Sequence, residues 1–213
     1  MTPEEFRRCG YQVVDWIADY RARAATLPVM SRVTPGEIKA RLPASPPSEP
    51  ERFEAVLADL ERVILPGLSH WQHPRFFGYF PSNGELASVL GDYLSTGLGV
   101  LGLSWQSSPA LTELEEVVTD WLRQMVGLSN AWSGVISDTA SSSTLVALIC
   151  ARERTSDFSL ARAGLQAGAA PLVVYVSAHS HSSVEKAALL DGFVRENIRA
   201  IPTDTGYAMR PDA

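Results

Sequence analysis

Residues 172–190 read LVVYVSAHSHSSVEKAALL, and this stretch decides the fold class. Its first five residues form an apolar run of strand length, and residues 183–190 repeat apolar side chains at helical spacing. A further short apolar run follows at 198–201. A strand, a helix and a second strand in this order are typical of a β-α-β unit, so the sequence predicts an α/β domain with a mostly parallel sheet.

The chain upstream of this unit continues the same alternation of elements. The apolar pair Val135-Ile136 predicts a short strand, and a helix is expected at 144–154. Two further helical patterns occupy 86–94 and 110–125. The second of them opens with a Ser-Pro pair and closes at a glycine, which are the usual signals for the two ends of a helix.

The N-terminal part has a different character, with helical patterns and no strand. The sequence TPEE at 2–5 combines a capping hydroxyl, a first-turn proline and a glutamate three residues after the cap, and TPGE at 34–37 repeats this signature. A third helix is expected at 53–64, after the proline-rich connector LPASPPSEPER at 42–52 and before a Pro-Gly pair. Three amphipathic helices make a poor independent globule, so we expect this segment to pack on a partner subunit.

The amino-acid composition argues against some classes of binding partner. The 213 residues are 46% hydrophobic and 20% charged, and the formal net charge is −6. This length predicts one large domain or two small ones, and the acidic balance argues against nucleic acid or an anionic membrane as a partner. The two cysteines, Cys9 and Cys150, give no disulfide framework and are expected to be buried thiols. With no long apolar segment in the sequence, we expect a cytoplasmic protein.

One candidate binding feature is the turn SDTASSST at 137–144, which leads from the expected strand into a helix. Free backbone N–H groups and the positive end of the helix dipole converge at such a turn, and hydroxyl side chains add donors without crowding a phosphate. Clusters of serine and threonine also serve as ordinary helix caps. The turn therefore predicts either an anion site or a simple cap.

A second candidate feature lies at the carboxyl end of the 172–176 strand, where open α/β sheets place their ligands. His179 and His181 occur there, but two histidines without a third ligand nearby are weak evidence for a metal site, and we assign none. The two rings could also be solvated. The interpretation we favour is one imidazole that faces a planar ligand, because such a ring can stack and can move protons near neutral pH.

The third candidate feature is the stretch HWQHPRFFGYFPSNG at 70–84. Its aromatic residues follow neither the helical nor the strand period, which predicts an irregular loop. Loops carry binding surfaces more often than cores do. The rings could line a binding site, or they could plug the side of a packed domain.

Four motifs, FFGYFPSNG, LGLSWQSSPALTELE, GVISDTASSSTLVAL and SAHSHSSVEKAALL, occur here in the order seen in one family. Through them the whole chain resembles the pyridoxal-phosphate-dependent aromatic-L-amino-acid decarboxylases, the group II enzymes of the DOPA-decarboxylase type. The resemblance implies an aspartate-aminotransferase-like α/β fold (PLP fold type I) and a homodimer with intertwined N-terminal helices. It implies a helical dimerisation segment at 1–79 and the first part of the large coenzyme-binding α/β domain at 80–213.

The resemblance also assigns roles to residues. Thr139, Ala140 and Ser141 would bind the phosphate of pyridoxal 5'-phosphate, and His181 would stack on the pyridine ring and act as the catalytic residue that helps to deliver a proton. The residues that match the substrate pocket are Trp71, Tyr79, Phe80, Pro81 and Ser82, with Leu101 and Leu103 reaching it from the other subunit.

The activity that the resemblance implies is decarboxylation of an aromatic L-amino acid of the DOPA, tyrosine, tryptophan or phenylalanine type to the amine and CO2. The family's enzymes continue beyond this sequence, so we expect an N-terminal half truncated within the large domain, with the C-terminal part elsewhere. Neither Lys39 nor Lys186 matches the lysine that attaches the coenzyme, so the isolated piece should be inactive. The alternatives are an aromatic aldehyde synthase of the same fold, a non-catalytic dimerisation fragment and, more remotely, an anion-binding domain without enzymatic activity.

Overall fold

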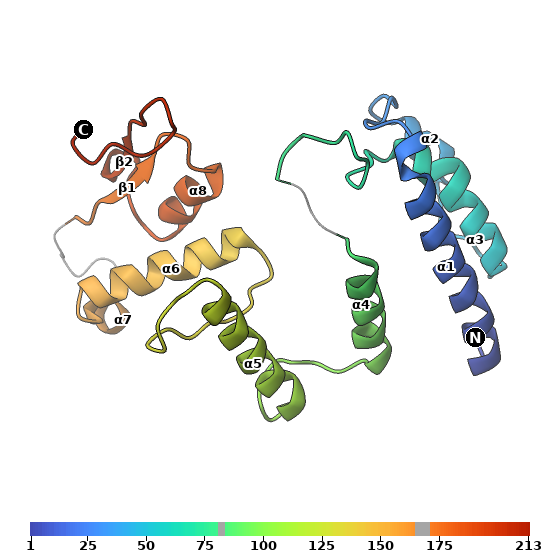
Figure 1. The fold of residues 1–213 in the computed structure, drawn as a ribbon, viewed down its shortest axis with the longest axis horizontal. Helices are drawn as coiled ribbons and strands as arrows, with labels where there is room; N and C mark the ends of the chain where they lie inside the picture. The colour runs from blue at the N-terminus through green and yellow to red at the C-terminus, as the bar shows by residue number, and fades with distance from the viewer. Residues whose placement is uncertain (81–83, 165–170) are drawn as a thin grey trace. The chain divides into compact units, whose positions relative to one another are not determined.

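The computed structural model describes residues 1–80, 84–164 and 171–213, which form two compact units, Met1–Val100 and Leu101–Ala213 (Figure 1). We call them unit 1 and unit 2. The elements of unit 1 are α1 (Pro3–Arg23), η1 (Ala24–Thr26), α2 (Glu37–Arg41), α3 (Phe53–Asp59), the π-helical turn η2 (Leu60–Ile64), η3 (Leu65–Gly67) and α4 (Leu86–Leu98). Those of unit 2 are α5 (Pro109–Met125), α6 (Ala140–Thr155), α7 (Ser159–Ala163), β1 (Val174–Ser177), α8 (Ser182–Leu190), η4 (Arg195–Asn197) and β2 (Ile198–Ile201).

The start of α1 confirms the predicted capping box. The Glu5 backbone N–H donates to the Thr2 hydroxyl at 3.2 Å, and the Thr2 N–H donates to the Glu5 carboxylate at 2.7 Å. These two bonds satisfy amide groups that have no partner inside the helix. Further along, the Trp16 indole donates to Glu61 at 3.1 Å and thereby joins α1 to η2.

The second helix of unit 1 begins later than its cap signature predicts. Its N-cap is Gly36 with φ +91°, a left-handed conformation that separates Thr34 and Pro35 from the helix. The Thr34 N–H still bonds to the Glu37 carboxylate at 3.2 Å, so half of the expected capping box survives as a turn. The third helical stretch ends at Gly67, as the Pro-Gly pair predicts, after a π-helical and a 3-10 turn.

Unit 2 contains the predicted β-α-β unit. Strands β1 and β2 pair in parallel with Val174 opposite Ile198 and Ser177 opposite Ile201, and α8 connects them (Figure 1). Helix α6 packs against α8. The mostly parallel sheet is thus present, although the described residues contain only these two strands.

The strand predicted at Val135-Ile136 was wrong. No strand forms there because no neighbouring strand in the described part of the chain shares its hydrogen bonds, and the Ile136 N–H donates instead to the Glu115 carboxylate at 2.7 Å. The side chains of Val135 and Ile136 are 74% and 59% exposed.

The cysteine prediction was half right. Cys9 is buried on α1, but Cys150 is exposed because it lies on a face of α6 that nothing in the described chain covers. Both thiols are free. Among the described residues, no helix has both the length and the apolarity needed to cross a bilayer.

Candidate functional site

The first part of the candidate site is the N-terminus of α6. Thr139 is its N-cap in an extended conformation, and the Thr139 hydroxyl accepts from the Ser142 N–H at 3.2 Å. The Ser143 N–H donates to the Thr139 carbonyl oxygen at 3.1 Å. The N–H groups of Ala140 and Ser141 have no acceptor among the described residues, and both residues are exposed. Two free amides at the positive end of a 16-residue helix can bind an anion.

The second part is His181, which is the N-cap of α8. Its Nδ1 accepts from the Ser183 backbone N–H at 3.2 Å and lies 2.9 Å from the Ser183 hydroxyl. In the neutral ring the proton is then on Nε2. The imidazole is exposed, so one face of the ring and the Nε2–H group are available to a ligand.

An ion pair joins the two helices that carry these groups. Arg152 of α6 lies 2.8 Å from the carboxylate of Asp191, the C-cap of α8, and its guanidinium also donates to the Asp191 carbonyl oxygen at 2.7 Å. The Asp191 side chain is 1% exposed. Burial raises the pKa of the Asp191 carboxyl above its ordinary value, although the Arg152 charge acts in the opposite direction.

A pocket of about 280 Å³ lies at the carboxyl end of β1. His181, Ser177 and Ser180 are among its lining residues, together with Glu185 and Arg195, which form an ion pair with each other. This is the edge at which open α/β sheets place ligands. Next to it, the ring of His179 lies edge-on to Tyr207 with 5.2 Å between centroids.

The predicted substrate residues of unit 1 are partly brought together. The ring of Trp71 stacks on Tyr79 with 5.6 Å between centroids and an interplanar angle of 11°, and on Phe76 at 4.9 Å. Tyr79 has φ +56°, a left-handed conformation that is costly for a residue with a side chain and that often occurs at functional sites. Phe80 is 91% exposed.

Other predicted substrate residues are exposed or undescribed. Pro81 and Ser82 lie outside the described residues. In unit 2, Leu101 and Leu103 are 74% and 86% exposed, so their side chains are free to contact another polypeptide. Exposed apolar side chains of this size are common where a second chain packs.

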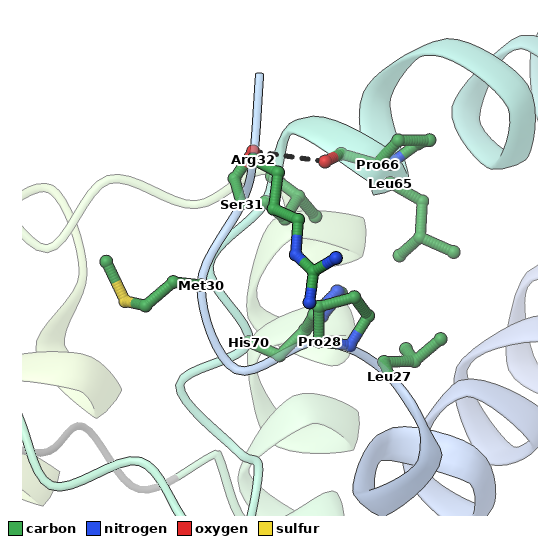
Figure 2. A pocket seen from close by; sticks show the side chains of 9 residues that line it. Leu27, Pro28, Met30, Ser31, Arg32, Leu65, Pro66 and His70 are labelled. Atoms are coloured by element: carbon green, nitrogen blue, oxygen red, sulfur yellow. Dashed lines mark hydrogen bonds between the residues drawn. The ribbon is translucent and has the colours of Figure 1, made fainter. Parts of the chain in front are cut away.

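A further pocket of about 270 Å³ belongs to unit 1 and was not predicted (Figure 2). The Ser31 hydroxyl closes one side of it by donating to the Pro66 carbonyl oxygen at 3.1 Å. Arg32 and His70 contribute its polar side chains, and the rest of the lining is largely apolar. This lining lacks the free helix amides found at the N-terminus of α6, and its one hydroxyl group, that of Ser31, already donates to Pro66.

Two supporting contacts of the site were not predicted from the sequence. Ser183 orients the His181 ring, and its position two residues after a capping side chain is a usable signal. The Arg152–Asp191 pair joins residues far apart in sequence and left no signal. No group of three metal-binding side chains occurs within the described ranges.

Comparison with known proteins identifies the family. The model of the pyridoxal-dependent decarboxylase conserved domain matches residues 35–213. The chain belongs to the pyridoxal-dependent decarboxylase family. The family assignment and the coenzyme, pyridoxal phosphate, that the four motifs predicted are thereby confirmed.

Two curated relatives match this chain over its whole length. Aromatic-L-amino-acid decarboxylase of Bos taurus is 42% identical over 224 residues, which cover 100% of this chain and 45% of the bovine protein. Phenylacetaldehyde synthase of Arabidopsis thaliana is 43% identical over 221 residues, which cover 100% of this chain and 44% of the plant protein.

The fold prediction is confirmed by a solved relative. The crystal structure of Catharanthus roseus tryptophan decarboxylase in complex with L-tryptophan matches with a TM-score of 0.90 and 38% identity, over 99% of this chain and 46% of that chain. The chain thus has the aspartate-aminotransferase-like fold of PLP fold type I. It spans less than half the length of the relatives that it matches.

The residues at the N-terminus of α6 fit the phosphate of the family's coenzyme. The first turn of α6 contains no acidic side chain, and the free amides of Ala140 and Ser141 are exposed beside the hydroxyl groups of Thr139 and Ser142. A helix end of this composition suits a dianionic group. The exposed imidazole of His181, held at Nδ1, suits a planar ring.

Proposed function

We propose that this chain supplies the N-terminal half of an enzyme that uses pyridoxal phosphate to decarboxylate an aromatic L-amino acid to the amine and CO2. The observation that carries the proposal is the pairing of α6 with α8. One helix presents free amides at its N-terminus, the other presents His181, and Arg152 and Asp191 join the two helices. Membership of the pyridoxal-dependent decarboxylase family supports a decarboxylation that uses pyridoxal phosphate.

In this proposal the α6 N-terminus binds the phosphate. The N–H groups of Ala140 and Ser141 would donate to phosphate oxygens, and the helix dipole favours the negative charge of such a group. Thr139 keeps these amides available because its own hydroxyl satisfies the Ser142 N–H group. These contacts would fix the position of the coenzyme with respect to α6.

His181 orients the ring and holds a proton. Its imidazole face would stack on the planar ring of the coenzyme, while Ser183 holds Nδ1 and leaves the proton of the neutral ring on Nε2. Bound pyridoxal phosphate supplies an electron-accepting ring that makes loss of CO2 from the α-carbon feasible. With a second proton on Nδ1, facing the Ser183 hydroxyl, His181 would donate the Nε2 proton as the amine forms and would be left as a neutral ring.

The aromatic substrate is recognised by the stacked rings of unit 1. Trp71 and Tyr79 offer parallel aromatic faces, and an aromatic side chain gains both buried area and stacking energy against them. By the family resemblance, Phe80, Pro81 and Ser82 would also contact the substrate, and Leu101 and Leu103 would do so from a second copy. Contact with these rings would favour aromatic over aliphatic amino acids.

The working enzyme is a cytoplasmic homodimer completed by the C-terminal part that the relatives carry. The chain exposes 16,532 Å². A compact monomer of its mass, 23.1 kDa, would expose about 9,700 Å², and two separate compact halves would expose about 11,600 Å². We infer that residues 1–79 cover a second copy and that the C-terminal part covers unit 2. The two free cysteines fit a reducing compartment.

A second activity, aromatic aldehyde synthesis, is favoured by the similarity to the phenylacetaldehyde synthase of Arabidopsis thaliana. That reaction consumes dioxygen and water together with the amino acid, and releases the aldehyde, CO2, ammonia and hydrogen peroxide. The two activities therefore differ in products that are easily measured.

The test is to assemble this chain with the C-terminal part of a relative, add pyridoxal phosphate, and supply DOPA, tyrosine, tryptophan and phenylalanine in separate reactions. We expect amine and CO2 in equal amounts and no ammonia. Aldehyde, ammonia and peroxide would assign the synthase activity instead. A stable dimer that binds no pyridoxal phosphate would contradict both, and would leave the chain as a dimerisation fragment.

A further inference from the structure

Two buried histidines flank the aromatic residue Trp71 in unit 1. His70 and His73 are 3% and 8% exposed, whereas Trp71 between them is 39% exposed. Buried polar side chains persist where they are hydrogen-bonded, so both rings should have defined partners. Their partners decide how firmly the exposed ring is held.

His70 fixes one side of Trp71 to α1. Its Nδ1 shares a hydrogen bond of 2.9 Å with the Tyr20 hydroxyl, and its backbone N–H donates to the Val29 carbonyl oxygen at 2.9 Å. The Tyr20 ring in turn stacks on Trp16 with 5.6 Å between centroids and an interplanar angle of 3°. Tyr20 is therefore held on α1 independently of the loop.

Trp16, on which Tyr20 stacks, is itself held by contacts within unit 1. The Trp16 indole donates to Glu61, and Arg23 donates to both oxygens of the same carboxylate at 2.6 and 2.7 Å. Both bonds come from the same guanidinium nitrogen, Nη2, so Arg23 holds the carboxylate that accepts from the Trp16 indole. The hydroxyl that meets His70 is thus presented by a chain of directed contacts rather than by apolar packing alone.

His73 fixes the other side of Trp71. Its Nδ1 accepts from the Arg75 backbone N–H at 2.9 Å, which leaves the proton of the neutral ring on Nε2, and Nε2 lies 3.2 Å from the Ala25 carbonyl oxygen. Ala25 belongs to η1, at the end of α1. The loop is tied to this end of α1 once more at Gly84, whose carbonyl oxygen accepts from Arg21.

We propose that Tyr20, His70 and His73 are positioning residues that set the orientation of the Trp71 ring, and thereby the affinity of the pocket for an aromatic substrate. The inference rests on the proposed function, because it takes Trp71 and Tyr79 as substrate contacts. Directed bonds on both sides of Trp71 restrict its backbone, and its ring then keeps its stacked position on Tyr79. Stacking is sensitive to ring offset and tilt, so a looser loop binds an aromatic ligand less well.

Lowering the pH should reduce the stability that buried, neutral His70 contributes. Burial, and then the nearby His73, lower the pKa of His70 below its ordinary value of 6.5. The unfolded chain therefore takes up a proton as pH falls through 6.5, while folded His70 stays neutral to a lower pH, so the stabilisation present above 6.5 declines below it. We expect the thermal unfolding temperature of the assembled enzyme to fall between pH 7.5 and pH 5. The fall should be smaller in the His70→Asn variant, and an equal fall in both would contradict the assignment.

The test of the positioning role compares four variants of the assembled enzyme. Tyr20→Phe removes the hydroxyl alone, and Tyr11→Phe is its matched control on an exposed part of α1. His70→Asn keeps a polar atom at the place of Nδ1, whereas His70→Gln moves it to the place of Nε2 and loses the bond to Tyr20. We expect Tyr20→Phe and His70→Gln to raise KM about fivefold with little change in kcat, and His70→Asn to restore KM.

A second readout makes the inference independent of turnover. Hydrogen exchange at the backbone amide of Arg75, and throughout 70–76, should accelerate in Tyr20→Phe and His70→Gln but not in Tyr11→Phe or His70→Asn. Unchanged exchange and unchanged KM in Tyr20→Phe would overturn the positioning role. Failure of the proposed function would be visible in the unsubstituted enzyme, which would form no product, while the exchange comparison would still decide whether these residues hold the loop.

Discussion

Replacing His181 with asparagine should lower kcat about 100-fold or more while α8 stays folded. Asparagine is a good N-cap, so its side chain can still accept the Ser183 N–H group that His181 Nδ1 accepts now. The substitution therefore removes the aromatic face and the Nε2 proton without removing the cap. Loss of a positioned proton donor typically costs about 10² to 10⁴ in rate. The measurement is amine formation under single-turnover conditions in the assembled enzyme.

The matched control for this prediction is Ser183→Ala, which keeps the imidazole and removes one of its two contacts. We expect a fall in kcat of only about threefold, because the backbone N–H of residue 183 still holds Nδ1. Circular dichroism should be unchanged for both variants. Full activity of His181→Asn would exclude a role for the ring in proton transfer.

Replacing Arg152 with methionine should destabilise unit 2 by about 2 to 3 kcal/mol. The Asp191 carboxylate is 1% exposed, and Arg152 is the cation beside it at 2.8 Å. Removing one partner of a buried pair leaves the other charge uncompensated, which costs more than the pair itself contributes. The expected result is a lower midpoint in urea unfolding, followed through the exchange protection of amides in β1 and α8.

The double variant Arg152→Met with Asp191→Asn tests whether the unpaired charge of Asp191 causes this loss of stability. Since the second change removes the stranded charge, we expect recovery of about half of the lost stability or more. Asp191→Asn alone should cost less than Arg152→Met, because burial already raises the pKa of that carboxyl and disfavours its charged form. An equal loss of stability in Arg152→Met and in the double variant would show that the charge pair contributes nothing to stability.

The local signals in the sequence predicted much of the fold. The capping box at Thr2 and the helix stop at Gly67 depend on neighbouring residues, and both are present in the structure. The strand at Val135-Ile136 failed for a physical reason, since a strand exists only with a partner and sequence period does not report one. Burial of Cys150 failed in the same way, because it depends on what covers α6.

Less of the candidate site than of the fold could be predicted from the sequence. Motifs identified His181 because it follows a strand and opens a helix, where ligands bind, and the turn at Thr139 because its hydroxyl-rich sequence opens a helix. The supporting contacts were not predictable, since the Tyr20–His70 bond spans 50 residues and the Arg152–Asp191 contact spans 39. Contacts of that range depend on tertiary packing, which neither period nor propensity encodes.

The most direct measurement is the crystal structure of the assembled enzyme with pyridoxal phosphate bound. Our account predicts phosphate oxygens about 3 Å from the backbone nitrogens of Ala140 and Ser141, and the pyridine ring lying face to face with the imidazole of His181. A coenzyme whose phosphate sits away from the start of α6, or whose ring does not touch His181, would contradict it.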